Sequence, residues 1–205
     1  NQTGCLLMEY VLSSLNKNGN LPTNGFTVKT VVTTEMARAI ADYYKVKLVE
    51  VLTGFKFIGE KIKEMDEFGK EKFLFGFEES YGYLAGSFVR DKDGVIASML
   101  IASMAAFYKS RGMTLLDGLE ELYQKYGYFL EEVKSFTLKG KEGLERIEYC
   151  MNRLRELKPS NFNKFKVKAI RDYKLKKRFV LDIGVEESLM LPESNVLYYE
   201  IEDNC

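Results

Sequence analysis

Three short apolar or β-branched stretches alternate with helical patterns in the first half of the chain, and this alternation most constrains the fold. The stretches cover residues 26–32, 46–51 and 72–75. Between them, apolar side chains recur at helical spacing around Met36 and Ile40, and again over residues 58–65. This strand–helix–strand–helix–strand order predicts an α/β layer in which helices cover a sheet. The third stretch is short and apolar on both faces, so we expect it to be a central strand.

Further helices are expected on either side of this alternation. Apolar groups at helical spacing predict one helix near residues 6–14. A long buried helix is expected at residues 95–110, after a loop at 77–94, and another helix at 115–126. Thr33 or Thr34 can cap the helix that follows the first strand, because a threonine hydroxyl accepts hydrogen bonds from the first free N–H groups of a helix.

The pattern changes near Gly127, and we place a domain boundary at about residue 128. Residues 129–205 then form a second unit of the α+β class. We expect a strand at 133–138 and an amphipathic helix at 143–157. Three strands should follow, at residues 165–170, 179–183 and 196–201. A small antiparallel sheet with one helix has little to cover its face, so we expect this unit to be truncated.

Composition excludes several classes of function. The 30 basic and 30 acidic residues cancel, so no global field attracts nucleic acid or an anionic membrane. No run of 18 apolar residues could span a bilayer. The absence of histidine excludes His-based catalysis and zinc sites that need imidazole. We therefore expect no nucleic-acid partner, no membrane partner and no metal ligand in this chain.

The cysteines and the first residue bear on location. Cys5, Cys150 and Cys205 are odd in number and far apart, which is typical of reduced structural thiols in the cytoplasm. The first residues show no signal-peptide pattern, which also favours a cytoplasmic location. Because the sequence starts with Asn1 rather than Met, we expect it to begin inside a longer protein.

The most informative stretch is Gly-Phe-Glu-Glu-Ser-Tyr-Gly-Tyr at residues 76–83, directly after the third strand. Ligands of open α/β sheets bind at the carboxyl ends of strands. Glu78 and Ser80 are two residues apart, so in an extended stretch both point to one side, where they could hold neighbouring sugar hydroxyls. Glu79 would then point toward the scaffold or solvent. The alternative interpretation is a solvated polar loop.

Two other features of this region could contribute to a site. Tyr81 and Tyr83 could pack against the apolar face of a sugar. Lys92, in the Arg-Asp-Lys-Asp-Gly run at residues 90–94, could bring a positive charge to a phosphate. The alternative for this run is a charged turn in which Asp93 caps the following helix.

Three segments in order resemble motifs of the α-D-phosphohexomutases, the phosphoglucomutase/phosphomannomutase family. Phe-Glu-Glu-Ser-Tyr-Gly at residues 77–82 resembles the family's sugar-binding loop, and the run at 90–94 resembles the segment before its long helix. Thr-Gly-Phe-Lys-Phe at residues 53–57 is similar to the loop that reads sugar orientation. The chain as a whole resembles the third domain, which is a three-layer α/β domain with a mixed sheet, and the front of the fourth.

The resemblance implies a function for the whole enzyme and roles for residues of this chain. Such an enzyme interconverts hexose 1-phosphate and hexose 6-phosphate through hexose 1,6-bisphosphate, with an active-site phosphoserine and Mg²⁺ held by aspartates. Glu78 and Ser80 would hold the 3- and 4-hydroxyls of the phosphorylated hexose. Thr53 and Gly54 would read its orientation, and Lys92 would lie near the reacting phosphate. Glucose and mannose differ at carbon 2, so these contacts are compatible with either sugar.

The departures from the family pattern are as informative as the matches. The chain contains no phosphoserine loop, no aspartate-rich metal loop and no phosphate clamp, so we expect no catalytic residue here and no activity of the chain alone. Its partners would be the remaining domains of the same protein. Gly82 stands where many members carry histidine, and Tyr83 is a possible replacement. The alternatives are a stand-alone, non-catalytic sugar-phosphate-binding module and a generic α/β interaction domain.

Overall fold

The computed structural model describes residues 1–69 and 71–202, which fall into two compact units. Unit 1 is Asn1–Glu132, and unit 2 begins at Val133. The boundary expected at about residue 128 lies just before this division.

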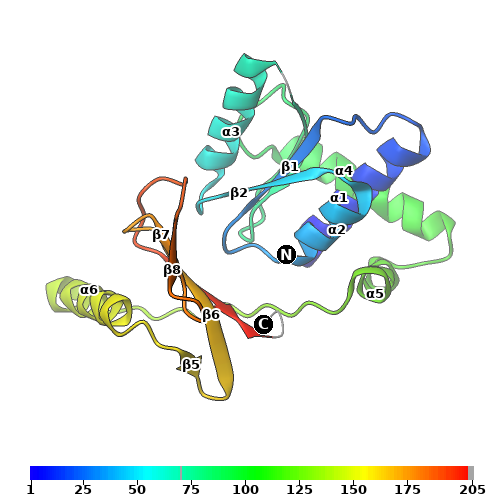
Figure 1. Ribbon diagram of the computed structural model, residues 1–205. Helices are drawn as coiled ribbons and strands as arrows, with labels where there is room; N and C mark the ends of the chain where they lie inside the picture. The colour runs from blue at the N-terminus through cyan, green and yellow to red at the C-terminus, as the bar shows by residue number, and fades with distance from the viewer. Residues whose placement is uncertain (70, 203–205) are drawn as a thin grey trace. The chain divides into compact units, whose positions relative to one another are not determined.

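Unit 1 is built on a four-stranded sheet with the strand order β2-β1-β3-β4 (Figure 1). Strands β1 (Gly25–Thr30), β2 (Lys47–Val51) and β3 (Lys72–Phe77) are parallel. The short strand β4 (Tyr83–Ala85) runs antiparallel to β3. Strand β3 therefore has a neighbour on each side, which confirms the prediction of a central strand.

Helices cover both faces of this sheet and give three layers (Figure 1). Helix α3 (Phe55–Phe68) packs on one face through Phe55, Ile58 and Ile62. The other face is covered by α1 (Gln2–Lys17), α2 (Met36–Tyr44), α4 (Gly94–Ser110) and α5 (Leu115–Tyr126). The predicted three-layer α/β architecture is confirmed.

Polar side chains accept hydrogen bonds from backbone N–H groups at the starts of two helices of unit 1, α4 and α2. The Asp93 carboxylate accepts hydrogen bonds from the N–H groups of Val95 and Ile96, so the capping interpretation of Asp93 is confirmed. The N-cap residue of α2 is Glu35, which makes no side-chain cap bond, so the prediction of Thr33 or Thr34 as the cap was wrong. The Thr34 hydroxyl still accepts from the Met36 N–H at 3.1 Å, one residue before the cap position. These contacts satisfy N–H groups that have no partner inside a helix.

One carboxylate joins three helices of unit 1. Glu9 of α1 accepts hydrogen bonds from the hydroxyl of Tyr44 in α2 at 2.8 Å and of Tyr126 in α5 at 2.6 Å. Lys125 of α5 donates to Glu9 at 3.0 Å and lies 3.8 Å from the ring centroid of Tyr43. A cavity of about 280 Å³ lies beside this cluster, and none of the predicted site residues lines it.

Three expectations for unit 1 and the segment after it were wrong. Residues 83–85 form a strand rather than loop, because Leu84 is buried against the α3 side of the sheet and pairs with Gly76. Helix α4 is not buried throughout, since Val95 and Met99 are exposed. Residues 133–138 form no strand, and no strand of the described chain pairs with them.

Unit 2 is an antiparallel sheet with one helix. Strand β6 (Phe165–Asp172) pairs with β7 (Lys177–Val180) on one side and with β9 (Leu197–Ile201) on the other. Strand β8 (Val185–Ser188) pairs with β7, and the short strand β5 (Asn161–Phe162) pairs with the start of β6. The expected α+β class is present, with β5 and β8 as additional strands.

Helix α6 (Gly140–Leu157) keeps the predicted amphipathic pattern, but much of its apolar face is open. Leu144 and Ile147 are exposed. Near its end, the Arg155 side chain forms a buried ion pair with Asp172 of β6, at 3.2 Å between Nε and Oδ1. This contact ties the helix to the sheet.

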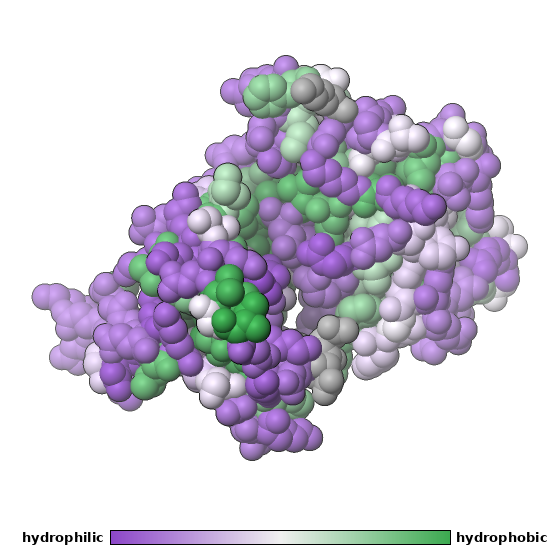
Figure 2. Space-filling model, in the orientation of Figure 1, coloured by the Kyte–Doolittle hydropathy of each residue, from purple (hydrophilic) through white to green (hydrophobic). Residues whose placement is uncertain are grey.

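Most of the face seen in Figure 2 is hydrophilic, and hydrophobic side chains are visible in smaller patches. Among the described residues, no helix has both the length and the apolar character needed to cross a bilayer. Cys5 is a buried free thiol and Cys150 an exposed one, while Cys205 lies outside the described residues.

Candidate functional site

The predicted loop lies at the carboxyl end of β3, beside the carboxyl end of β1. The two strands are parallel, and Lys29 of β1 pairs with Phe77 of β3. Residues 78–82 connect β3 to β4 as a tight hairpin, which the Glu78 N–H closes by donating to the Gly82 carbonyl oxygen at 3.0 Å. The edge of the sheet where ligands of α/β proteins bind is therefore occupied by this hairpin.

Glu78 has an unusual environment for an acidic side chain. It is only 6 % exposed, and its carboxylate has no hydrogen-bond or ion-pair partner among the described residues. A carboxylate removed from water is costly unless donors compensate it. The carboxylate oxygens are not fully enclosed by protein, so they retain contact with solvent. Glu78 is therefore free to accept hydrogen bonds from a ligand.

The neighbours of Glu78 in the hairpin have different surroundings. Glu79 turns toward the scaffold, where its Oε2 accepts from the hydroxyl groups of Thr30 at 3.0 Å and Thr33 at 3.2 Å. The predicted opposite orientation of Glu79 is confirmed. Ser80 is exposed at the tip of the hairpin.

The two tyrosines of the loop differ from each other. Tyr81 is 82 % exposed and remains available to a ligand. Tyr83 belongs to β4 and is buried in the core formed with α1. The predictions that Tyr83 packs against a sugar or replaces a loop histidine were therefore wrong, because the alternation along β4 turns its ring inward.

Phe55 brings the three predicted segments together. A Cβ atom added to Gly82 would lie 2.7 Å from both Oε1 of Glu78 and Cδ2 of Phe55, so these two side chains are neighbours. Nζ of Lys92 lies 5.8 Å from the centroid of the Phe55 ring. The absence of a side chain at residue 82 is what lets the glutamate and the ring approach each other.

The backbone of the turn before Phe55 fixes where helix α3 begins. Gly54 has φ of 119°, a conformation that favours glycine. Its carbonyl oxygen accepts from the Phe57 N–H at 3.0 Å and so starts α3. Thr53 is exposed. Sequence reasoning singled out Thr53 and Gly54 and missed Phe55, although its place next to the glycine turn was a usable signal.

A groove of about 580 Å³ opens next to Phe55 and Lys92. Its other lining residues come from α3 and the segment before α4: Lys56, Gly59, Glu60, Lys63, Arg90 and Asp91. Glu78, Ser80 and Thr53 are not among the lining residues. Four cationic side chains against two carboxylates give the groove a positive balance, which suits an anionic group.

The described residues offer no set of protein ligands for a metal. No group of three or more His, Cys, Asp or Glu side chains in this part of the chain is placed to hold an ion. The Glu78 carboxylate and the Ser80 hydroxyl at this edge of the sheet are groups able to form hydrogen bonds with a ligand, and the Lys92 ammonium is able to attract an anion.

Comparison with known proteins identifies the family of the chain. The family model described as phosphoglucomutase/phosphomannomutase, alpha/beta/alpha domain III, matches residues 1–126. The chain belongs to the phosphoglucomutase/phosphomannomutase family. The matched residues cover almost all of unit 1, including all three segments that meet at Phe55.

Curated members of the phosphoglucomutase/phosphomannomutase family match nearly the whole chain. The phosphoglucomutase of Staphylococcus haemolyticus is 36 % identical over 196 residues, which is 96 % of this chain and 35 % of that protein. The phosphoglucomutase of Staphylococcus aureus strain MRSA252 is 38 % identical over 197 residues, with the same shares. The chain thus spans about a third of the length of these relatives.

A solved structure of this family has the same fold. The open form of the exocytosis-sensitive phosphoprotein pp63/parafusin from Paramecium, a phosphoglucomutase, aligns with a TM-score of 0.56 and 16 % identity. The alignment covers 98 % of this chain and 32 % of that structure. The likeness therefore extends over both units of the chain.

Proposed function

We propose that this chain supplies the sugar-recognition part of a phosphohexomutase, which interconverts hexose 1-phosphate and hexose 6-phosphate through a bisphosphorylated hexose. In this proposal the chain corresponds to the family's third domain and the first part of its fourth. The phosphoserine and the Mg²⁺ ligands belong to other parts of the enzyme, and this chain alone has no activity. The enzyme acts in the cytoplasm.

The observation that carries the proposal is the unpaired carboxylate of Glu78 at the edge of the sheet. With the Ser80 hydroxyl, it would hold the 3- and 4-hydroxyls of the sugar. A bisphosphorylated intermediate must turn over so that each phosphate visits the phosphoserine in turn. The 3- and 4-hydroxyls nearly superpose after this turn, so one pair of protein groups can serve both orientations.

Holding these hydroxyls places the reacting phosphate in line for transfer, and positioning is the main lever in phosphoryl transfer. Lys92 would lie near that phosphate, next to the groove with a positive balance. Thr53 and Gly54 would contact the sugar through the turn that leads to Phe55. No step of this proposal needs a metal ligand from the chain.

The test is substitution of the two hydrogen-bonding residues in the natural protein that contains this chain. Glu78→Ala should lower kcat/KM for glucose 1-phosphate about ten- to hundredfold, since a hydrogen bond to a charged group contributes about 1.5–3 kcal/mol. Ser80→Ala should lower it about two- to tenfold, since a hydrogen bond between neutral groups contributes about 0.5–1.5 kcal/mol. Glu120→Gln is the matched control, because Glu120 is exposed on α5 far along the chain from the loop. Unchanged kinetics of Glu78→Ala would refute the proposal.

A binding measurement beside the kinetic assay distinguishes this proposal from the alternative of a stand-alone binding module. If the natural protein binds glucose 1-phosphate in calorimetry but does not turn it over, and Glu78→Ala abolishes the binding, the module interpretation is correct and the mutase proposal is wrong.

A further inference from the structure

The contact that holds Glu79 is a triangle of three oxygen atoms. Oε2 of Glu79 lies 3.0 Å from the Thr30 hydroxyl and 3.2 Å from the Thr33 hydroxyl, and the two hydroxyls are 2.8 Å apart. Each hydroxyl has one hydrogen to donate, so two of the three contacts are hydrogen-bonded at any moment. Thr30 and Thr33 are buried. The carboxylate of Glu79 is thus bound by groups from a different strand and turn.

The turn that carries these hydroxyls is itself held by a buried cation. Lys29 is completely buried, and its Nζ donates to the carbonyl oxygens of Thr33 at 3.0 Å and Thr30 at 3.4 Å. The Thr33 N–H also donates to the Thr30 carbonyl oxygen at 3.1 Å. The backbone at both threonines is therefore fixed before the loop contacts it.

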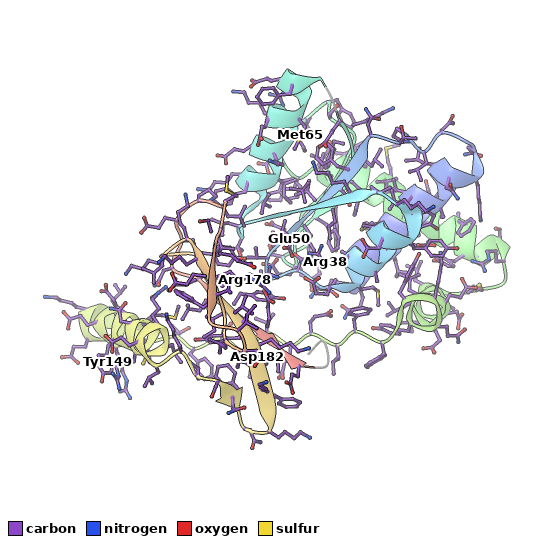
Figure 3. The ribbon with its side chains drawn as sticks, in the orientation of Figure 1. Arg38, Glu50, Met65, Tyr149, Arg178 and Asp182 are labelled. Carbon is purple, nitrogen blue, oxygen red and sulfur yellow. The ribbon has the colours of Figure 1, made fainter. Side chains whose placement is uncertain are left out.

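Two carboxylates balance the charge of this cation. Nζ of Lys29 lies 2.8 Å from Glu35 and 3.0 Å from Glu50. The Arg38 guanidinium lies 2.8 Å from Oε2 of Glu35 and 2.9 Å from Oε1 of Glu50. These two cations and two carboxylates have no net charge. Figure 3 shows Arg38 and Glu50 side by side. Burial opposes ionisation of Glu35, but the hydrogen bonds and charges of Lys29 and Arg38 outweigh it and lower its pKa.

The contact of Glu79 with Thr30 and Thr33 restrains the loop that carries Glu78 and Ser80. Glu79 lies between Glu78 and Ser80 in the sequence, so fixing its side chain restrains the backbone from which both neighbours project. The loop contains φ of 65° at Tyr81, and a backbone hydrogen bond from the Glu78 N–H to the Gly82 carbonyl oxygen closes it. Its orientation therefore depends strongly on the Glu79 contact.

We propose that Thr30 and Thr33 are positioning residues for sugar binding, which act through Glu79 to aim Glu78 and Ser80 at the substrate. This inference rests on the proposed function and adds two residues outside the three motif segments. Hydroxyl groups at positions 30 and 33, rather than the size of the side chains, are what the loop requires.

The test is a double-mutant cycle in the natural protein that contains this chain. Thr30→Val/Thr33→Val removes both hydroxyls at nearly constant volume, and Glu79→Ala removes their partner from the loop side without touching β1. Each should lower kcat/KM for glucose 1-phosphate at least tenfold. Adding the two valines to Glu79→Ala should cause less than a twofold further loss, because the contact is already gone.

Two controls separate positioning from general stability. Thr27→Val is the matched control, since Thr27 is a buried threonine of the same strand. Its hydroxyl donates a long hydrogen bond to the Lys47 carbonyl oxygen, at 3.5 Å, and none to Glu79. Thr27→Val should leave kcat/KM within twofold of wild type. Thr30→Ser/Thr33→Ser keeps both hydroxyls and should restore kcat/KM, even where the lost methyl groups lower Tm.

The outcomes distinguish this inference from the proposed function. Additive losses in the cycle, or kcat/KM within twofold of wild type for Glu79→Ala, would overturn the positioning role. If Glu78→Ala still lowers kcat/KM at least tenfold in that case, the proposed sugar contact stands. If Glu78→Ala has no effect either, the proposed function itself is wrong. Should the double valine variant not fold, Glu79→Ala and the serine variant carry the test.

Discussion

At the scale of the residue, Tyr81 combines two features that are unfavourable for stability. Its φ of 65° lies in the left-handed region, which costs an L-amino acid about 1–2 kcal/mol. Its ring is 82 % exposed and gains little from burial. Strained residues of this kind cluster at ligand sites, where the cost is tolerated because the geometry serves binding. The place of Tyr81 next to Ser80 fits this pattern.

Replacement of Tyr81 by glycine should therefore raise the stability of the chain. Tyr81→Gly should increase the free energy of unfolding by up to about 1 kcal/mol, because relief of strain exceeds the entropic cost of glycine in the unfolded chain. Urea denaturation of the 205-residue chain measures this difference. Tyr81→Ala removes the same ring but keeps the strain, so it should not be stabilised. Equal stability of the two variants would show that the strain is absent in solution.

At the scale of the element, the sequence predicted the elements whose pattern is local. The helical spacing around Met36 and Ile40 and the apolar run of β3 both led to the correct elements, because each buries a face against the layer next to it. The stretch containing Val133 and Phe136 also carries residues that favour strands, but it forms no strand. Strand formation needs a partner edge, and propensity does not reveal whether one exists.

The candidate site shows the same division between local and non-local information. Glu78 and Ser80 were found because they follow a strand directly. Phe55 and the two threonines that hold Glu79 were missed as parts of the site, because their roles depend on which strands become neighbours. Thr30 meets Glu79 across 49 positions of sequence, a contact that no short motif encodes.

The acid stability of unit 2 should depend on one carboxylate of β9. Arg178 donates to Glu200 at 2.6 Å and 2.8 Å, and Arg171 at 2.6 Å. Hydrogen bonds from Arg178 first, and then from Arg171, lower the pKa of Glu200 from 4.5 to about 2, against the opposing effect of burial. A carboxylate with a lowered folded-state pKa stabilises fully above its unfolded pKa and loses this contribution as pH falls through the folded value.

The expected result is a difference in stability between wild type and Glu200→Gln that depends on pH. The wild-type chain should be the more stable above pH 4.5, and its advantage should shrink between pH 4.5 and about 2. Thermal unfolding followed by near-ultraviolet circular dichroism across this range measures the difference. Glu193→Gln is the control, because Glu193 is exposed and takes no part in the ion pairs of Glu200. A difference independent of pH would contradict the assigned ion pairs.

At the scale of the whole molecule, the chain consists of two compact units. The division between them follows residue 132. The family model covers unit 1, whereas the alignments to curated relatives extend through unit 2. Unit 1 carries every residue of the proposed sugar contact, so recognition of the sugar should depend on the integrity of this unit before that of its neighbour.

The irregular stretch between α5 and α6 has a practical consequence for proteolysis. Residues 127–139 contain no helix or strand, and the Phe136 side chain is 84 % exposed. Proteases cut exposed chain that can enter their active sites without unfolding a core. Brief chymotrypsin digestion should therefore cut first near Phe136 and release two folded pieces, and Phe136→Ala should slow this cut. A first cleavage inside either core would mean that the stretch is protected in solution.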